Sequence, residues 1–207
     1  MASADPTRRG LSEGANGSRT PFAKAFFDLV VRRGYTRCEE PFVLSSGQTS
    51  YDYVDLRKAV ADGADLEIAA RALIEHLDRL GVDYAAIGGM TMGADPFAHA
   101  VALLRPTSWF SVRKAEKSHG SKRRIEGADL SGERVVLLED TASTGGSILS
   151  AYEVVNDTSA TVVHACALLD RGDQTARTFS RLGVSYSSVL SYRDLGIEPI
   201  VASTRSN

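Results

Sequence analysis

Apolar side chains recur at helical spacing in two segments of the N-terminal half. The first run consists of Phe22, Ala25, Phe26, Leu29 and Val30. The second run consists of Leu66, Ala69, Ala70, Leu73, Leu77 and Leu80. Pro21 suits a first helical turn, and Gly34 and Gly81 end the two runs. The pattern therefore predicts two amphipathic helices.

Short, continuous apolar runs then alternate with helical patterns along the chain. The runs typical of buried strands are 83–87, 109–112, 134–138, 161–169 and 184–190. Helical patterns lie between them at 97–104, 146–155 and 174–182. Asp95 suits the N-cap of the first of these helices, with Pro96 at its first position. The alternation predicts an α/β fold with a mainly parallel sheet flanked by helices on both faces.

The N-terminal segments have a different character. Residues 1–20 carry only Leu11 as a large apolar side chain, which predicts a disordered leader. Residues 42–55 predict two extended pieces joined at Ser46-Gly47, as in a hood or an edge hairpin. We therefore expect a single domain over 21–207, with hood elements at about 21–60.

Composition and charge exclude several classes of function. The 207 residues carry a formal charge of -2, which removes a global electrostatic argument for nucleic acid or an anionic membrane as partner. No apolar run approaches the roughly 20 residues of a membrane span, and residues 1–9 lack the apolar stretch of a signal peptide, so we expect a cytoplasmic protein. Cys38 and Cys166 have no CxxC partner, which predicts buried thiols rather than a disulfide or a zinc site.

The segment that follows the predicted strand 134–138 combines carboxylates, hydroxyls and glycines. It reads Glu139, Asp140, Thr141, Ala142, Ser143, Thr144, Gly145, Gly146 and Ser147. Ligands bind at the carboxyl ends of parallel strands, and a glycine turn at a helix N-terminus suits a phosphate. The two carboxylates fit a ligand that also carries hydroxyls and a divalent cation. A capped surface helix is the alternative, whereas the Walker A and GxGxxG patterns are absent.

A second concentration of charge lies between residues 113 and 126. Its basic members are Arg113, Lys114, Lys117, Lys122, Arg123 and Arg124, with His119 among them. In a chain of net charge -2, such a cluster predicts a polyanionic ligand. Gly120 and Gly127 favour a lid that closes over substrate. A solvated surface loop and a nucleic-acid patch are the alternatives.

These motifs resemble those of a known family. Residues 135–147 resemble the phosphoribosyl-diphosphate (PRPP) motif of the type I phosphoribosyltransferases, and residues 113–120 resemble the RKxxKxHG loop of the orotate phosphoribosyltransferases. With similar segments at 42–47, 53–55 and 88–96, the resemblance covers about 21–197. It implies the type I phosphoribosyltransferase fold and Mg²⁺-dependent transfer of a phosphoribosyl group from PRPP to orotate. By the same resemblance, the expected products are orotidine 5′-monophosphate and pyrophosphate, in UMP biosynthesis.

The chemistry of this transfer assigns roles to the residues. We expect Arg113, Lys114, Lys117 and His119 to bind the diphosphate. The catalytic set is Lys117, Asp140, Lys114 and His119, in which Lys117 gains most strength as negative charge builds on the leaving group. Glu139 and Asp140 would hold the ribose hydroxyls, and residues 141–147 the 5′-phosphate. Mg²⁺ would be bound mainly through PRPP and water, with no direct protein ligand.

Arg171, after the strand 161–169, is the candidate partner of the orotate carboxylate, and Ser143 could add a contact to orotate. An ion pair of Arg171 with Asp170 or Asp173 is the alternative. We expect the remaining side chains of note to pack in the core. They are His76, His99, His164 and Trp109.

The sequence departs from the family pattern at two positions of the predicted hood. Many members carry a lysine where Ser45 stands and a basic residue where Gln48 stands. A paralogous transferase acting on another heteroaromatic acid, and a non-catalytic sensor of PRPP or a nucleotide, therefore remain alternatives. The resemblance also implies a homodimer with shared active sites.

Overall fold

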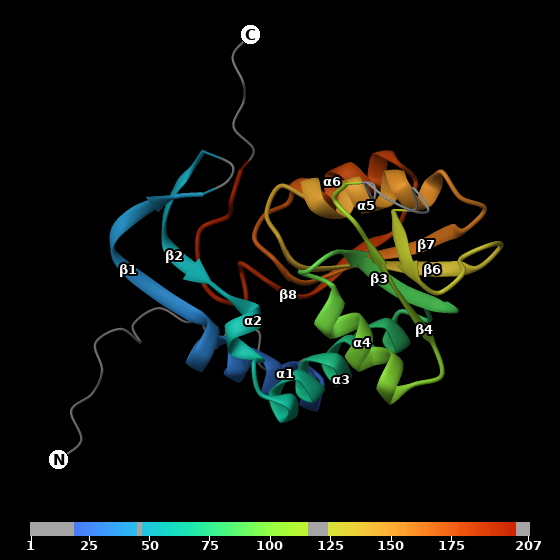
Figure 1. The fold of residues 1–207 in the computed structure, drawn as a ribbon. Coiled ribbons are helices and arrows are strands. Elements are labelled where there is room, and N and C mark those ends of the chain that lie inside the picture. The colour runs from blue at the N-terminus through green and yellow to red at the C-terminus, as the bar shows by residue number, and fades with distance from the viewer. Residues whose placement is uncertain (1–18, 45–46, 116–123, 202–207) are drawn as a thin grey trace, which may run out of the picture.

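The computed structural model describes residues 19–44, 47–115 and 124–201. Within them, a six-stranded sheet has the order β5-β4-β3-β6-β7-β8 (Figure 1). The strands are β3 (Ala86–Met90), β4 (Ser108–Val112), β5 (Ile125–Gly127), β6 (Arg134–Ala142), β7 (Thr161–Asp170) and β8 (Tyr186–Ser191). All neighbours are parallel except the edge strand β5, which runs antiparallel to β4. The predicted mainly parallel sheet is confirmed.

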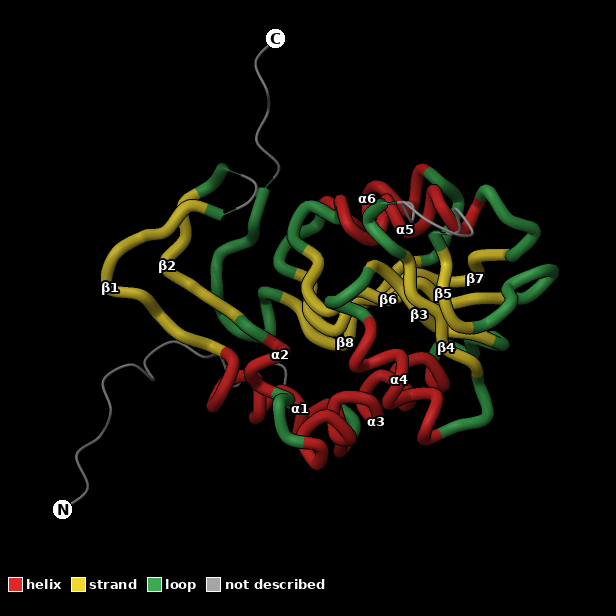
Figure 2. The backbone as a smooth tube through the Cα atoms, in the orientation of Figure 1, coloured by secondary structure: helices red, strands yellow, loops and turns green. Residues whose placement is uncertain are grey.

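Helices cover both faces of this sheet (Figure 2). One face carries α1 (Pro21–Leu29), α3 (Gly63–Arg79) and α4 (Asp95–Leu104), and the other carries α5 (Gly146–Asn156) and α6 (Gln174–Arg181). Thr20 caps α1, because its hydroxyl oxygen accepts the Ala23 N–H at 3.3 Å. In the part of the chain that the structure describes, no helix has both the length and the apolar character that a bilayer crossing requires.

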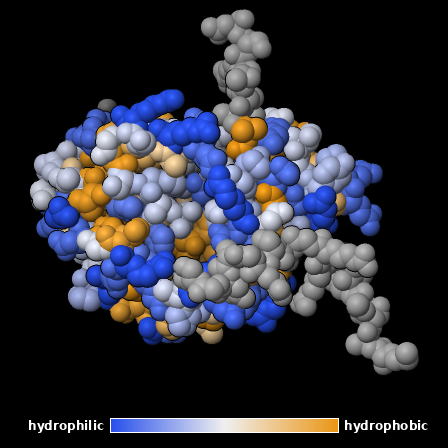
Figure 3. Space-filling view, turned by 180° about the vertical axis from the view of Figure 1, so that it is seen from behind, coloured by the Kyte–Doolittle hydropathy of each residue, from blue (hydrophilic) through white to orange (hydrophobic). Residues whose placement is uncertain are grey.

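The alternation of side chains along β6 explains its continuous apolar run. Val136 and Leu138 belong to the core cluster beneath α1, α3 and α4, whereas Val135 and Leu137 belong to the cluster beneath α5 and α6. All four are fully buried. A strand covered on both faces must be apolar at successive positions, as the sequence predicts. On the outside, hydrophilic residues separate small hydrophobic patches on the face seen in Figure 3.

A two-stranded hairpin stands beside the main sheet (Figure 1). The chain passes from α1 through η3 (Val30–Gly34), a short π-helix, into β1 (Tyr35–Val43), β2 (Thr49–Val54) and α2 (Leu56–Ala59). β1 and β2 are antiparallel, with register Tyr35↔Val54 and Val43↔Thr49. This is the predicted hood hairpin, although β1 begins seven residues before the predicted start at residue 42. The chain that follows β8 runs alongside it.

Several expected boundaries are wrong. β6 runs to Ala142, so Glu139 and Asp140 lie on the strand and not in the turn after it. β3 spans 86–90 rather than 83–87, and Gly88-Gly89 lies inside it. The strand β5 was not expected, since its three residues show no apolar alternation.

Three side chains also differ from their predicted environments. Asp95 is not the N-cap of α4 but its first residue. Trp109 is 38% exposed and not a core residue. Cys38 is only half-buried, whereas Cys166 is buried as predicted, and both thiols are free.

The glycine pair in β3 allows the strand to lie close to its neighbours. A Cβ atom at Gly89 would approach the Leu138 carbonyl oxygen to 1.9 Å and the Ala94 Cβ to 2.9 Å. A Cβ atom at Gly88 would meet the Phe110 carbonyl oxygen at 1.9 Å. Any side chain at either position therefore requires the backbone of an adjacent strand to move.

We expect Gly89→Ala to lower the free energy of unfolding by about 2–3 kcal/mol, because the added methyl group overpacks a site bounded by backbone. Urea denaturation of the variant and the parent measures this difference. Gly63→Ala is the matched control, because nothing lies within 4 Å of its Cβ position at the start of α3. Equal stability of Gly89→Ala and the parent would contradict the steric argument.

Candidate active site

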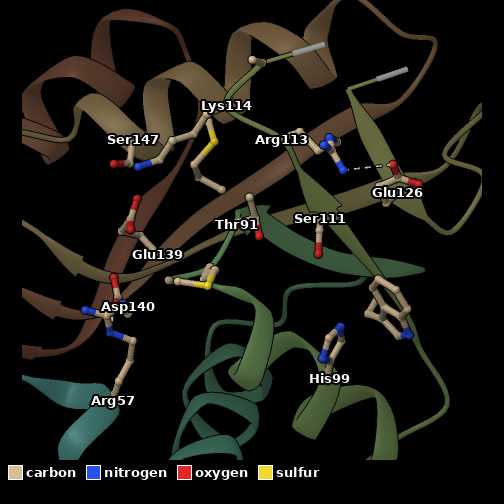
Figure 4. A pocket seen from close by; sticks show the side chains of 15 residues that line it. Arg57, Thr91, His99, Ser111, Arg113, Lys114, Glu126, Glu139, Asp140 and Ser147 are labelled. Atoms are coloured by element: carbon tan, nitrogen blue, oxygen red, sulfur yellow. Dashed lines mark ion pairs between the residues drawn. The ribbon is translucent and has the colours of Figure 1, made fainter. Parts of the chain in front are cut away.

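A cavity of about 840 Å³ opens at the carboxyl edge of the sheet (Figure 4). Its walls come from β3 and the loop after it, from β4, β5 and β6, from α2 and α4, and from the start of α5. The lining residues are Arg57, Met90, Thr91, Met92, Gly93, His99, Trp109, Ser111, Arg113, Lys114, Ala115, Glu126, Glu139, Asp140 and Ser147. The structure thus brings the acidic pair and two cations of the 113–126 segment, Arg113 and Lys114, into one cavity.

Glu139 lies at the base of this cavity and is only 6% exposed. Its Oε2 atom has no hydrogen-bond partner among the described residues. Burial, reinforced by the adjacent Asp140 carboxylate, raises the pKa of Glu139 to about 9. The residue is therefore held mostly as the neutral acid at neutral pH until a ligand or a cation compensates its charge.

Asp140 is oriented by contacts on several sides. Its Oδ1 atom accepts the Thr141 backbone N–H at 2.7 Å, and its Oδ2 atom lies 3.9 Å from Arg57 Nε. A Cβ atom at Gly93 would lie 2.8 Å from Asp140 Oδ1, so glycine leaves room for the carboxylate. These contacts place acceptor oxygens where the hydroxyls of a sugar could donate to them.

The turn after β6 leads directly into α5. Gly145 has a φ of +79° and precedes the helix, in a conformation that favours glycine. A Cβ atom there would also lie 2.8 Å from the Thr175 hydroxyl oxygen. The first turn of α5 presents backbone N–H groups and the partial positive charge of a helix N-terminus, and Ser147 faces the cavity. The turn is thus suited to a phosphate group.

Two cations of the 113–126 segment, Arg113 and Lys114, also line the cavity, and Lys114 lies on the side of Ser147 and Glu139 (Figure 4). Arg113 Nη1 lies 3.7 Å from Glu126 Oε1, across the β4–β5 pair (Figure 4). Arg124 fixes the backbone there, because its Nη2 atom donates to the carbonyl oxygens of Arg113 at 3.0 Å and Lys114 at 3.2 Å. The predicted residues Lys117 and His119 lie outside the described residues.

The loop after β3 contributes residues that sequence reasoning did not assign to the site. Asp95 accepts hydrogen bonds from Thr91 Oγ1 at 2.6 Å and from Ser111 Oγ at 2.7 Å, which ties this loop to β4. Arg57 was also missed. The loop's part in the site could have been predicted from its position at the carboxyl end of a parallel strand. No motif in the sequence around Arg57 indicates that this residue lines the cavity.

Arg171 lies outside the cavity lining, beneath the hood hairpin. The residue is 3% exposed, and its Nη1 atom donates to the Asp52 carbonyl oxygen at 3.1 Å. Its Nε and Nη2 atoms have no hydrogen-bond partner among the described residues. The alternative ion pairs are not formed, because Asp170 accepts from Tyr186 and Gly172, and Asp173 contacts Arg193. Ser143 is half-buried in the turn before α5.

The histidines divide between the core and the cavity. His76 and His164 each place Nε2 within 2.8 Å of the Ser187 hydroxyl, away from the cavity, and burial lowers the pKa of His76 to about 4. His99 instead lines the cavity and packs edge-on against Trp109, with ring centroids 4.4 Å apart. The expectation that all three histidines pack in the core therefore fails for His99.

Comparisons with known proteins agree with this geometry. The family model described as "Phosphoribosyl transferase domain" matches residues 58–180. Orotate phosphoribosyltransferase of Mycobacterium tuberculosis H37Rv is 42% identical over 160 residues, which is 75% of this chain and 87% of that protein. The Mycobacterium leprae enzyme of the same name is 44% identical over 159 residues, covering 74% of this chain and 86% of that protein.

Solved structures show the same relationship. The crystal structure of the M. tuberculosis H37Rv orotate phosphoribosyltransferase in complex with PRPP has a TM-score of 0.71 and 36% sequence identity, covering 86% of this chain and all of that one. The same enzyme in complex with Fe(III) dicitrate has a TM-score of 0.74 at 37% identity, with the same coverage. The chain therefore belongs to the orotate phosphoribosyltransferase family of phosphoribosyl transferase domains.

Proposed function

We propose that the chain is an orotate phosphoribosyltransferase that transfers the phosphoribosyl group of PRPP to orotate, giving orotidine 5′-monophosphate and pyrophosphate for UMP synthesis. One observation carries the proposal: a single cavity holds the Glu139–Asp140 pair, the N-terminus of α5 and the cations Arg113 and Lys114. PRPP carries a ribose diol, a 5′-phosphate and a diphosphate. Each of these groups has a complementary partner in the cavity.

The reaction forms a bond from an orotate ring nitrogen to the anomeric carbon while the bond from that carbon to the diphosphate oxygen breaks. The N–H proton of that ring nitrogen is released to water or to the departing pyrophosphate. Positive charge develops on the ribose and negative charge on pyrophosphate, so both ends require stabilisation. Glu139 and Asp140 hold the ribose hydroxyls beside the developing positive charge. Arg113 and Lys114, with Lys117 and His119 of the same segment, bind the departing pyrophosphate. Lys117 gains most as the charge builds.

The remaining groups of the substrates have partners close by. Residues 141–147 bind the 5′-phosphate through backbone N–H groups and hydroxyls. Orotate contacts Ser143 and places its carboxylate on Arg171, whose unpaired Nε and Nη2 atoms suit a planar, two-oxygen partner. The Arg171 backbone N–H donates to the Ala142 carbonyl oxygen at 2.7 Å, so the two binding regions are directly linked.

The site suits a divalent cation that binds together with PRPP. Among the described residues, no three His, Cys, Asp or Glu side chains gather as a metal site. The carboxylates of the Glu139–Asp140 pair instead give the cavity a negative local field that favours Mg²⁺, which would be held mainly by PRPP and water without a direct protein ligand. When bound, Mg²⁺ would neutralise part of the charge of the leaving pyrophosphate.

A homodimer with shared sites is supported by the surface next to the cavity. A groove of about 660 Å³ runs beside α4, β4 and β5, and shares His99 and Trp109 with the cavity. Leu103 is 88% exposed on its rim. A second copy seated there would cover apolar surface and lie next to the diphosphate side of the site.

The free thiols of Cys38 and Cys166 fit a reducing compartment such as the cytoplasm.

The proposed activity is tested by incubating the protein with PRPP, Mg²⁺ and orotate and following the loss of orotate absorbance. We expect turnover, with one pyrophosphate released for each orotate consumed. PRPP binding without orotate turnover would reject the proposal. Consumption of PRPP with another heteroaromatic acid would then identify a paralogous transferase, and the absence of any turnover would identify a sensor.

Glu139→Gln should make the fold more stable and the binding of PRPP weaker. The pKa of Glu139 is about 9 in the folded chain and near 4.5 when unfolded, so folding favours the neutral acid and the parent loses stability as pH rises through this interval. Glutamine does not titrate. Its advantage in unfolding free energy should therefore be at least about 1 kcal/mol larger at pH 8 than at pH 5. Urea denaturation at both pH values measures this, and an advantage independent of pH would contradict it.

Complementation between two inactive variants tests the shared sites. Lys117→Ala removes the cation that stabilises the leaving group, and Asp140→Asn removes a ligand of the ribose, so each homodimer should lose at least about 99% of its activity. If the loop of one subunit serves the site of the other, a mixed dimer contains one intact site and should recover up to half of the parental activity per dimer. No recovery in verified heterodimers would show that each site is built from one chain.

A further inference from the structure

The side chain of Gln48 joins the chain after β8 to the hood hairpin. Gln48 Nε2 donates to the Pro199 carbonyl oxygen at 3.3 Å, and Gln48 Oε1 accepts the Val201 backbone N–H at 2.8 Å. Both ends of the amide thus bind the backbone of one short segment, 199–201. In Figure 1 this segment is the red trace beside the β1–β2 hairpin.

The middle residue of the same segment contacts Arg171. The Ile200 backbone N–H donates to the Arg171 carbonyl oxygen at 2.6 Å. A Cβ atom at Gly172 would lie 2.2 Å from the Ile200 carbonyl oxygen and 3.5 Å from that of Ser143. The segment therefore lies directly against the backbone that follows β7, next to the turn that precedes α5.

A second contact joins the hood hairpin directly to Arg171. Arg171 Nη1 donates to the carbonyl oxygen of Asp52 in β2, the strand that begins just after Gln48. The Asp52 side chain is itself held by Tyr35 Oη and Arg37 Nη1, each at 2.9 Å from Oδ1. The hairpin thus reaches Arg171 by two routes, one direct and one through Gln48 and the segment 199–201.

These contacts surround the guanidinium group of Arg171, which keeps unpaired hydrogen-bond donors. Arg171 is 3% exposed, and its Nε and Nη2 atoms have no hydrogen-bond partner among the described residues. Unpaired buried donors are unfavourable, and an incoming carboxylate would satisfy both of them. A guanidinium group kept dry and in place also binds a carboxylate more tightly than a hydrated, mobile one.

We propose that Gln48 is a positioning residue for the acceptor: its amide clamps the hood hairpin to the segment 199–201 and so keeps Arg171 fixed and shielded from water for the orotate carboxylate. The inference rests on the proposed function, because it takes orotate as the ligand of Arg171. It gives Gln48 a role that requires a neutral amide, since the side chain must donate and accept at once.

Gln48→Met tests the clamp, because methionine keeps the length of the side chain but cannot form these two hydrogen bonds. We expect the KM for orotate to rise about 10-fold, while kcat and the KM for PRPP stay within twofold of the parent. Removal of residues 199–207 should have the same effect, and the combined variant should be no worse than either change alone. Removal of residues 202–207 is the control, since it leaves the clamp in place.

Hydrogen exchange gives a second measurement that does not depend on catalysis. The Val201 amide should exchange at least about 10-fold faster in Gln48→Met, while amides of α3 remain protected as in the parent. Unchanged exchange at Val201, or equal rises in both KM values, would overturn the clamp. If the parent does not turn over orotate, the proposed function fails, and the exchange measurement alone decides whether Gln48 holds the segment.

Discussion

The close pairing of β3 with β6 is the constraint on which the site depends. Gly89 lies so near the Leu138 carbonyl oxygen that no side chain fits between the strands. This pairing brings the loop after β3 and the end of β6 to the same edge of the sheet. The consequence is visible at Gly93, where the absence of a Cβ atom again leaves space, this time for the Asp140 carboxylate. Two glycine positions, one in β3 and one in the loop after it, thus determine where the acidic pair can lie.

The arrangement of charge in the cavity favours ligand binding over stability. Glu139 is buried with an unpaired oxygen and a like-charged neighbour, which disfavours its ionised form in the folded chain. Asp140, in contrast, has two partners: Arg57, whose Nε atom lies 3.9 Å from Oδ2, and the Thr141 backbone N–H, which donates to Oδ1. A ligand that brings hydroxyl donors and a metal ion would compensate the unpaired Oε2 atom of Glu139. Unpaired polar groups of this kind are typical of functional sites.

The sequence was most informative where burial and local spacing act together. Val135 to Leu138 is buried on both faces, and the sequence places it correctly in a central parallel strand. The nine residues from Glu139 to Ser147 were predicted as one binding segment because their chemistry is contiguous in the chain, and Glu139, Asp140 and Ser147 of this segment line the cavity. Their exact geometry was not predictable, since β6 continues to Ala142 only by pairing with β7, a contact made between distant parts of the chain.

The environments of Trp109 and Arg171 were not predictable from local pattern for the same reason. Trp109 is apolar and lies in a strand, yet it is exposed because the strand is next to the edge of the sheet and only the three residues of β5 lie beyond it. Arg171 was correctly placed at the end of its strand, but its burial depends on β2, more than a hundred residues earlier. Gln48 differs from the family pattern, and only the fold reveals its partners in the C-terminal segment.

The shortness of β5 also limits how another molecule can join the sheet at that end. The strand comprises only Ile125–Gly127, and Gly127, with a φ of +93°, turns the backbone out of the extended conformation. Among the described residues, little regular backbone is therefore left there to template an added strand. A molecule that meets this described part of the edge would associate through its side chains, and the two sheets would remain separate.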